Sequence, residues 1–199
     1  MRGPIYKNMA GFTLAEMMVA IAIGMVVIAS VTGTFRAQTR QNKAEEEISQ
    51  MHQNVRGALD IISRELMQAG YKASGGSVTG VTYDSAQLLM QADLNLNGSI
   101  DTSSTSQEYI IYIFDSANMR ITRQLGASGT AEIVADNITA CTFTYKDASD
   151  ATTTTSASIR KVTVSITGRT AKVDPSYSSN SGYRTYTLSV DIAPPNLAL

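Results

Sequence analysis

Residues 11–35 read GFTLAEMMVAIAIGMVVIASVTGTF and contain one charged residue, Glu16. A helix of about 20 apolar residues crosses a bilayer core of about 30 Å, so this stretch is long enough to span a membrane. The preceding residues, MRGPIYKNMAG, include Arg2 and Lys7, which favour a cytoplasmic N-terminus. The sequence therefore predicts a single membrane-spanning helix at residues 12–35.

A candidate processing site lies in front of this apolar stretch. A secretory signal peptide has its apolar region upstream of the cleavage site and loses it on cleavage. Cleavage between Gly11 and Phe12 would instead leave the apolar helix on the mature protein. An uncleaved single-span anchor is the alternative interpretation at this point.

Glu16 is the unusual residue of the stretch. A charged side chain at mid-membrane costs about 2.5–3.5 kcal/mol on insertion scales and usually faces a partner or marks a functional site. Near the cytoplasmic end a carboxylate is also tolerated at the interface. Cleavage after Gly11 would create an α-amino group at Phe12, one helical turn away. We expect this amine and the Glu16 carboxylate to pair between neighbouring helices that are shifted along their axes, since the attraction is strong in apolar surroundings.

The motif GFTLAE at residues 11–16, followed by an apolar helix, resembles the class III signal of type IV pilins and of the pseudopilins of type II secretion. The resemblance implies that a prepilin peptidase cleaves after Gly11 and N-methylates Phe12. It also implies that Glu16 neutralises the Phe12 amine of an adjacent subunit in a filament.

Residues 36–70 are predicted to continue the helix as an amphipathic segment. Apolar residues recur at spacings of three and four and therefore share one stripe; they are Ile48, Met51, Val55, Leu59, Ile62 and Leu66. Such a stripe is buried most simply against a sheet of the same chain. Gly70 is the expected stop. Residues 54–71, NVRGALDIISRELMQAGY, resemble the corresponding stretch of PilW-type minor pilins and, more loosely, of J-type pseudopilins.

The remaining chain reads as strands separated by turns. Candidate strands are residues 86–91, 108–114, 119–125, 138–146, 160–167 and 184–192. In the last two, apolar and polar residues alternate, which is typical of an antiparallel sheet with one solvated face. Residues 115–118 predict a hairpin turn, and residues 147–158 and 174–182 predict exposed loops. The expected fold class is α+β, a long N-terminal α-helix packed on an antiparallel β-sheet head domain.

One loop fits the start of an EF-hand type calcium loop, the sequence DLNLNGSID at residues 93–101. Its candidate ligands are spaced so that their oxygens converge on one cation; they are Asp93, Asn95, Asn97, Ser99 through its carbonyl, and Asp101. The twelfth loop position, which usually holds a bidentate Glu, is Ser104, and Glu108 could substitute if the chain folds back. We expect weak calcium affinity, on the order of 10⁻⁴–10⁻³ M. A metal-free turn rich in Asn and Gly is the alternative.

Composition argues against several other functions. The chain has one Cys, Cys141, and one His, His52, so no intramolecular disulfide, zinc site or nucleophile–base pair is expected. We expect Cys141 in a buried strand position and His52 on the helix surface. The formal net charge of −1 gives no basic field for nucleic acid. We therefore expect a protein that is not an enzyme and has no specific nucleic-acid partner.

These observations predict four regions: a leader peptide at residues 1–11, a transmembrane and assembly helix at 12–35, an amphipathic helix at 36–70 and a β-sheet head domain at 71–199. The resemblance implies a PilW-type minor pilin, a structural and priming subunit of a type IV pilus. Its implied partners are the prepilin peptidase and other major and minor pilins. It would lie in the inner membrane with its head in the periplasm and then in the cell-surface pilus.

Two alternatives remain open from the sequence. One is a J-type pseudopilin of type II secretion, which shares the same signal and mechanism. The other is a membrane-anchored, calcium-dependent adhesive module that never polymerises.

Overall fold

The helix α1 runs without a break from Leu14 to Leu66. The computed structural model describes residues 11–73 and 76–198 of the chain. Within it, residues up to Glu45 and residues from Glu46 onward form two units, which are described separately below. α1 ends four residues before the expected stop. Gly70, with a φ of 81°, then completes the turn that follows, in a conformation that favours glycine.

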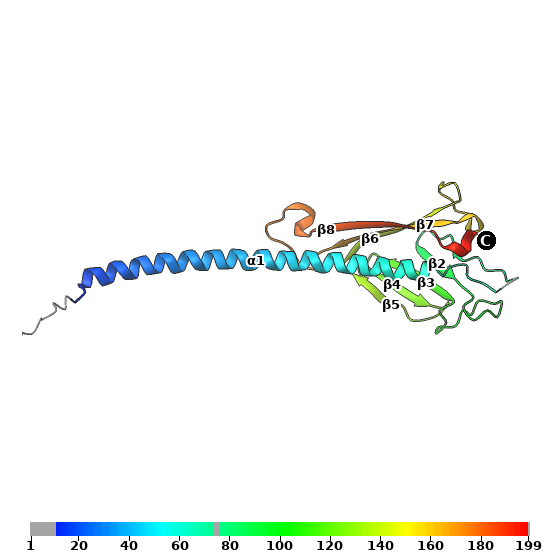
Figure 1. Cartoon of the computed structure of the whole chain (residues 1–199), viewed down its shortest axis with the longest axis horizontal. Helices are drawn as coiled ribbons and strands as arrows, with labels where there is room; N and C mark the ends of the chain where they lie inside the picture. Colours follow the sequence, from blue (N-terminus) through cyan, green and yellow to red (C-terminus); the bar gives the residue numbers. More distant parts are fainter. Residues whose placement is uncertain (1–10, 74–75, 199) are drawn as a thin grey trace, which may run out of the picture. The chain divides into compact units, whose positions relative to one another are not determined.

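The second unit contains two antiparallel sheets (Figure 1). The five-stranded sheet has the order β1 (Val81–Thr82), β2 (Gln87–Gln91), β3 (Tyr109–Asp115), β4 (Arg120–Leu125) and β5 (Glu132–Asp136). The three-stranded sheet has the order β6 (Ile138–Lys146), β7 (Lys161–Arg169) and β8 (Thr185–Ile192). Short 3-10 helices lie in the connections and at the end of the chain: η1 (Ser156–Ser158) between β6 and β7, η2 (Ser179–Gly182) between β7 and β8, and η3 (Pro195–Ala198) after β8. The six predicted strands are present within one or two residues, and the α+β fold class is confirmed.

The described strands form two sheets, and the chain passes from the first to the second at Asn137. This residue lies between β5 and β6 and has a φ of 57°, a left-handed conformation that Asn tolerates better than most residues. Directly after it, the backbone N–H of Ile138 donates to the carbonyl of Met119 at 2.8 Å. β5 therefore stays with the first sheet, and β6 starts the second.

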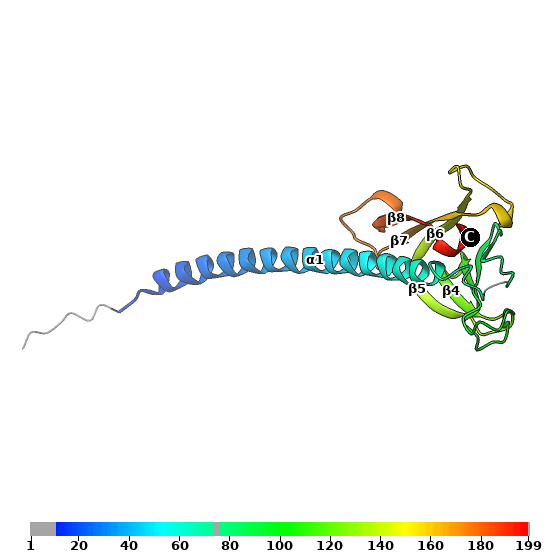
Figure 2. The same ribbon diagram turned by 45° about the vertical axis from the view of Figure 1, so that its right-hand side comes forward.

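One hydrophobic core joins the C-terminal part of α1 to both sheets. Figures 1 and 2 show this part of the helix running alongside the strands of both sheets. Of the predicted stripe, five residues are buried, namely Met51, Val55, Leu59, Ile62 and Leu66, and Ile48 is half-buried. From β7, Val162, Val164 and Ile166 are all fully buried. The prediction that an amphipathic helix packs on alternating strands is therefore confirmed.

A close approach between α1 and β7 depends on Gly168. A Cβ atom at this position would lie 2.5 Å from Cγ2 of Val55, which is closer than two non-bonded carbon atoms can come. Valine is stiff at χ1 and cannot easily move away. The absence of a side chain at Gly168 therefore lets the helix lie against this strand.

A partly buried ion pair ties α1 to the five-stranded sheet. Nη2 of Arg123 in β4 donates to Glu65 Oε1 at 2.7 Å. The side chain of Arg123 is 16% exposed and that of Glu65 is 21% exposed. The hydroxyl of Tyr112 in β3 donates to Glu65 Oε2. Burial, followed by the hydrogen bond to Glu65, raises the pKa of Tyr112, so this phenol remains protonated. All three groups are satisfied by one another, as partly buried polar groups require.

The predicted turn and loops are present, and one loop is well braced. At residues 115–118, the N–H of Asn118 donates to Asp115 Oδ1 at 3.1 Å and closes the hairpin between β3 and β4. In the loop at 174–182, Asp174 Oδ2 accepts hydrogen bonds from Nε of Arg184 at 3.0 Å and from Nη2 of Arg184 at 2.9 Å.

Candidate functional site

The first half of α1 presents apolar side chains on all sides. Phe12 is 85% exposed and Phe35 is 70% exposed, and the apolar side chains between them are exposed as well. Among the residues that the structure describes, α1 is the one helix that is long and apolar enough to cross a membrane, judged by length and composition. A helix that is apolar all round needs lipid or other helices around it. This geometry fits the predicted membrane anchor.

The start of α1 is closed by a reciprocal pair of hydrogen bonds. Glu16 Oε2 accepts the backbone N–H of Thr13 at 2.8 Å and the Thr13 hydroxyl at 2.9 Å. In return, Thr13 Oγ1 accepts the backbone N–H of Glu16 at 3.2 Å. This arrangement is a capping box, in which a Thr and a Glu three residues later satisfy the free N–H groups of a helix start.

The capping box gives Glu16 a hydrogen-bond partner in its own chain, in addition to the predicted pairing with the Phe12 amine of another subunit. Its sequence signal is Thr-x-x-Glu before an apolar run, and it is present at residues 13–16. The described hydrogen bonds all use Oε2, and a carboxylate offers about four lone-pair sites. Glu16 therefore retains acceptor capacity for a second donor. Of the predicted processing residues, Gly11 and Phe12 are exposed, and residues 1–10 of the predicted leader lie outside the described residues.

The predicted metal loop is wound around the carboxylate of Asp93. This side chain is fully buried, and it accepts backbone N–H groups from Asn97 at 3.1 Å and Gly98 at 2.9 Å. The turn at Gly98 has a φ of 83°, a conformation that favours glycine.

The other predicted ligands form consecutive side-chain turns. Asn95 Oδ1 accepts from the N–H of Asn97 at 2.9 Å, and Asn97 Oδ1 accepts from the N–H of Ser99 at 2.8 Å. Asp101 Oδ1 likewise accepts from the N–H of Ser103 at 2.9 Å. These exposed oxygens therefore brace the loop itself.

Glu108 folds back onto the loop. Its side chain is buried, and its two oxygens accept the N–H of Asn95 at 3.1 Å and of Asp101 at 2.9 Å. Two buried carboxylates, Asp93 and Glu108, thus hold the two sides of the same loop. Within residues 11–73 and 76–198, no group of three or more His, Cys, Asp or Glu side chains is arranged to hold a metal ion.

His52 and Cys141 are placed by their packing. The ring of His52 is half-buried, with its centroid 4.2 Å from that of Tyr186. Cys141 in β6 is half-buried against the core, and burial raises the pKa of its thiol to about 12. Neither residue lies in a site with other reactive groups that the structure describes.

Comparison with known proteins identifies the class to which this molecule belongs. Residues 6–32 match the prokaryotic N-terminal methylation motif. Residues 45–192 match the family described as prepilin peptidase-dependent protein B, and because this match covers well over half of the chain, the chain belongs to that family. It is a type IV pilin-like family with a structural and not an enzymatic role.

Among solved structures, the chain is similar to a type IV-like pilin from Thermus thermophilus. The two are 12% identical with a TM-score of 0.43, over 77% of this chain and 98% of the other. No curated protein matches the sequence. The resemblance to type IV pilin-like proteins is therefore confirmed by the family matches, together with dependence on a prepilin peptidase.

Proposed function

We propose that this protein is a minor pilin of the PilW type, a structural and priming subunit of a type IV pilus. A prepilin peptidase cleaves the chain after Gly11 and methylates the new amino group of Phe12. Residues 12–35 hold the subunit in the inner membrane, with the head domain in the periplasm, and then pack against the helices of other pilins. The pilus carries the subunit to the cell surface.

This proposal is supported by the exposed apolar start of α1 together with the match of residues 6–32 to an N-terminal methylation motif. The matched residues 6–32 include the proposed cleavage site between Gly11 and Phe12 and most of the apolar helix that follows it. This supports processing that leaves the helix attached. A helix that is exposed on all sides and apolar is suited first to lipid and then to a bundle of similar helices.

Glu16 gives the proposed assembly its register. After cleavage, the Phe12 amine of one subunit meets the Glu16 carboxylate of the next, at the acceptor sites that the capping box leaves free. In apolar surroundings this attraction is several times stronger than in water. Helices that slide out of this register leave a charge without a partner, which is costly.

We also propose that the Asp93 loop binds calcium weakly. The ligands would be Asp93, Asn95, Asn97, the Ser99 carbonyl and Asp101. The support is that Glu108 folds back and holds the same loop as Asp93 with a second buried carboxylate. Each carboxylate keeps lone pairs beyond those used for backbone N–H groups.

Recovery of this chain in sheared filaments tests the proposed function. Surface filaments sheared from producing cells should contain this chain together with major pilin, and cells without prepilin peptidase should retain it in the membrane. A chain that stays wholly in the inner membrane of piliated cells would contradict a pilus subunit and favour a non-polymerising anchor. Recovery with a type II secretion pseudopilus instead would favour the J-type pseudopilin.

A further inference from the structure

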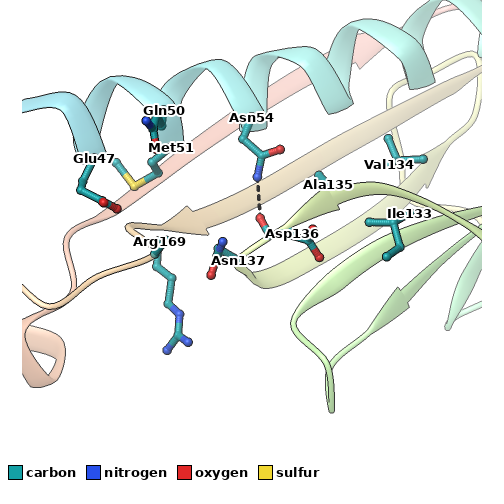
Figure 3. Close-up of a pocket in the computed structure, with 11 residues that line it drawn as sticks. Glu47, Gln50, Met51, Asn54, Ile133, Val134, Ala135, Asp136, Asn137 and Arg169 are labelled. Atoms are coloured by element: carbon teal, nitrogen blue, oxygen red, sulfur yellow. Dashed lines mark hydrogen bonds between the residues drawn. The ribbon is translucent and has the colours of Figure 1, made fainter.

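A cleft of about 510 Å³ lies between α1 and the outer edge of β5 in the second unit (Figure 3). Its walls include Glu47, Met51 and Asn54 of α1, residues 133–137, and Arg169 at the end of β7. This α1–β5 cleft contains none of the residues assigned above to processing, assembly or metal binding.

One wall of the cleft is an edge strand. Among the described strands, β5 pairs with β4 alone, so its other edge has no strand beside it. An edge of this kind offers backbone N–H and C=O groups to another chain. At one end, the side-chain amide of Asn54 donates to the backbone carbonyl of Asp136, in the way that a peptide N–H would (Figure 3). Toward the other end, Ile133 is 55% exposed.

Two buried polar atoms in the walls have no hydrogen-bond partner among the described residues, Glu47 Oε2 and Arg169 Nε. The other oxygen of Glu47 accepts from Lys172 Nζ at 3.0 Å, so the carboxylate is satisfied on one side only. An unsatisfied buried polar group destabilises the folded state. Glu47 Oε2 lacks a donor and Arg169 Nε lacks an acceptor, and a peptide main chain supplies both.

We propose that the α1–β5 cleft receives an extended peptide segment of a neighbouring filament subunit, which adds to the outer edge of β5 as a further strand. Main-chain groups of the segment pair with β5, as in strand addition to other sheet edges. Its donor and acceptor groups complement Glu47 and Arg169, and one of its apolar side chains covers Ile133. The peptide segment belongs to another subunit of the same filament, so this inference rests on the proposed function.

Site-specific photocrosslinking in producing cells tests the inference on the full chain. A benzophenone amino acid replaces Ile133 in one variant and Val173 in a control, because Val173 is also about half exposed, at 50%, and does not line the cleft. The Ile133 position should crosslink to another filament subunit, and mass spectrometry should place the crosslink in an extended segment of that subunit. The Val173 position should give no such product.

A pair of lysine variants gives an independent readout. Ile133→Lys places a charge on the β5 edge, which blocks strand addition, and the exposure of Ile133 allows the head to fold normally. Its recovery in sheared filaments should fall several-fold relative to the membrane fraction. Val173→Lys should be recovered like the wild type.

The outcomes separate this inference from the proposed function. Normal recovery of Ile133→Lys in filaments, with no crosslink from position 133, would overturn the strand addition and leave the pilin assignment standing. A crosslink to lipid or to a helical segment would identify a different occupant and would also overturn it. Absence of the wild-type chain from filaments would instead remove the proposed function.

Discussion

Thr13 and Glu16 hydrogen-bond to each other in both directions, with Glu16 Oε2 accepting the Thr13 N–H at 2.8 Å and Thr13 Oγ1 accepting the Glu16 N–H at 3.2 Å. The pair satisfies two of the N–H groups that a helix start leaves free. Glu16 therefore stabilises its own helix in addition to the proposed charge pairing between subunits. These two roles make different demands on the side chain, since capping accepts an uncharged group and charge pairing does not.

Substitutions at Glu16 separate the two roles. Gln serves at this position of a capping box as Glu does, so Glu16→Gln keeps the cap and loses the charge. We expect both Glu16→Gln and Glu16→Ala to insert in the membrane and to be depleted from sheared filaments. Thr13→Ala removes the cap hydroxyl, costs about 1 kcal/mol locally and should still be incorporated. Normal incorporation of Glu16→Gln would show that capping alone explains the residue.

The close approach of α1 to β7 predicts a large effect for a small substitution. Gly168→Ala adds one methyl group against Val55 and should destabilise the head by about 1–3 kcal/mol, as overpacking does. The matched control is Gly57→Ala, because a Cβ at this exposed helix position meets nothing within 4 Å. It should be neutral or stabilising by up to about 1 kcal/mol. Thermal unfolding of the full chain in detergent, followed by circular dichroism, measures both. Equal melting temperatures for Gly168→Ala and the wild type would contradict the packing.

Most of the fold could be predicted because its signals are periodic. The stripe from Met51 to Leu66 and the alternation in β7 each repeat over many residues, so both the element and its buried face follow from the sequence. β5 was missed because Glu132–Asp136 is a short strand without regular alternation, with exposed Glu132, Ile133 and Asp136. The chain passes between the two sheets at Asn137, a position that no periodic pattern marks.

The candidate site was predictable where spacing along the chain fixes geometry. The turn at Gly98 follows from the loop motif, and the start of α1 follows from the apolar run. The oxygens of Asn95, Asn97 and Asp101 accept N–H groups of the loop itself. The fold-back of Glu108 was raised only as an alternative, because it depends on how β3 pairs with β2. The α1–β5 cleft was not predictable, since its walls combine residues near positions 50, 135 and 169, which only the tertiary structure brings together.

Acid should loosen the loop at residues 174–182. Hydrogen bonds from Ser176, and then from Arg184, hold the pKa of Asp174 below its ordinary value of 3.8. A pKa lowered by folding gives stabilisation that is complete above the unfolded-state value and is lost as the pH falls through the folded-state value. This contribution should therefore persist at neutral pH and disappear below about pH 4. Carboxyl NMR titration should show an upward shift of the Asp174 midpoint in Ser176→Ala, and an unchanged midpoint would contradict the assigned cause.

Calcium should stabilise the head if the Asp93 loop binds it. At a calcium concentration about tenfold above the dissociation constant, the stabilisation is about 1.4 kcal/mol. Chelation should then lower the melting temperature, and Asn97→Ala should abolish the response. The control Asp147→Ala removes an acid outside the loop, so this variant should still lose melting temperature on chelation. A melting temperature that is the same with calcium and with chelator would remove the calcium proposal and leave the pilin assignment unaffected.

The N-terminus of the chain in filaments tests the proposed assembly mechanism most directly, because the Phe12 amine exists only after cleavage. Mass spectrometry of the protein recovered from sheared filaments should find a chain that begins at Phe12 with a methylated amino group. Filaments that contain the chain with residues 1–11 still attached would contradict the charge pairing between Phe12 and Glu16.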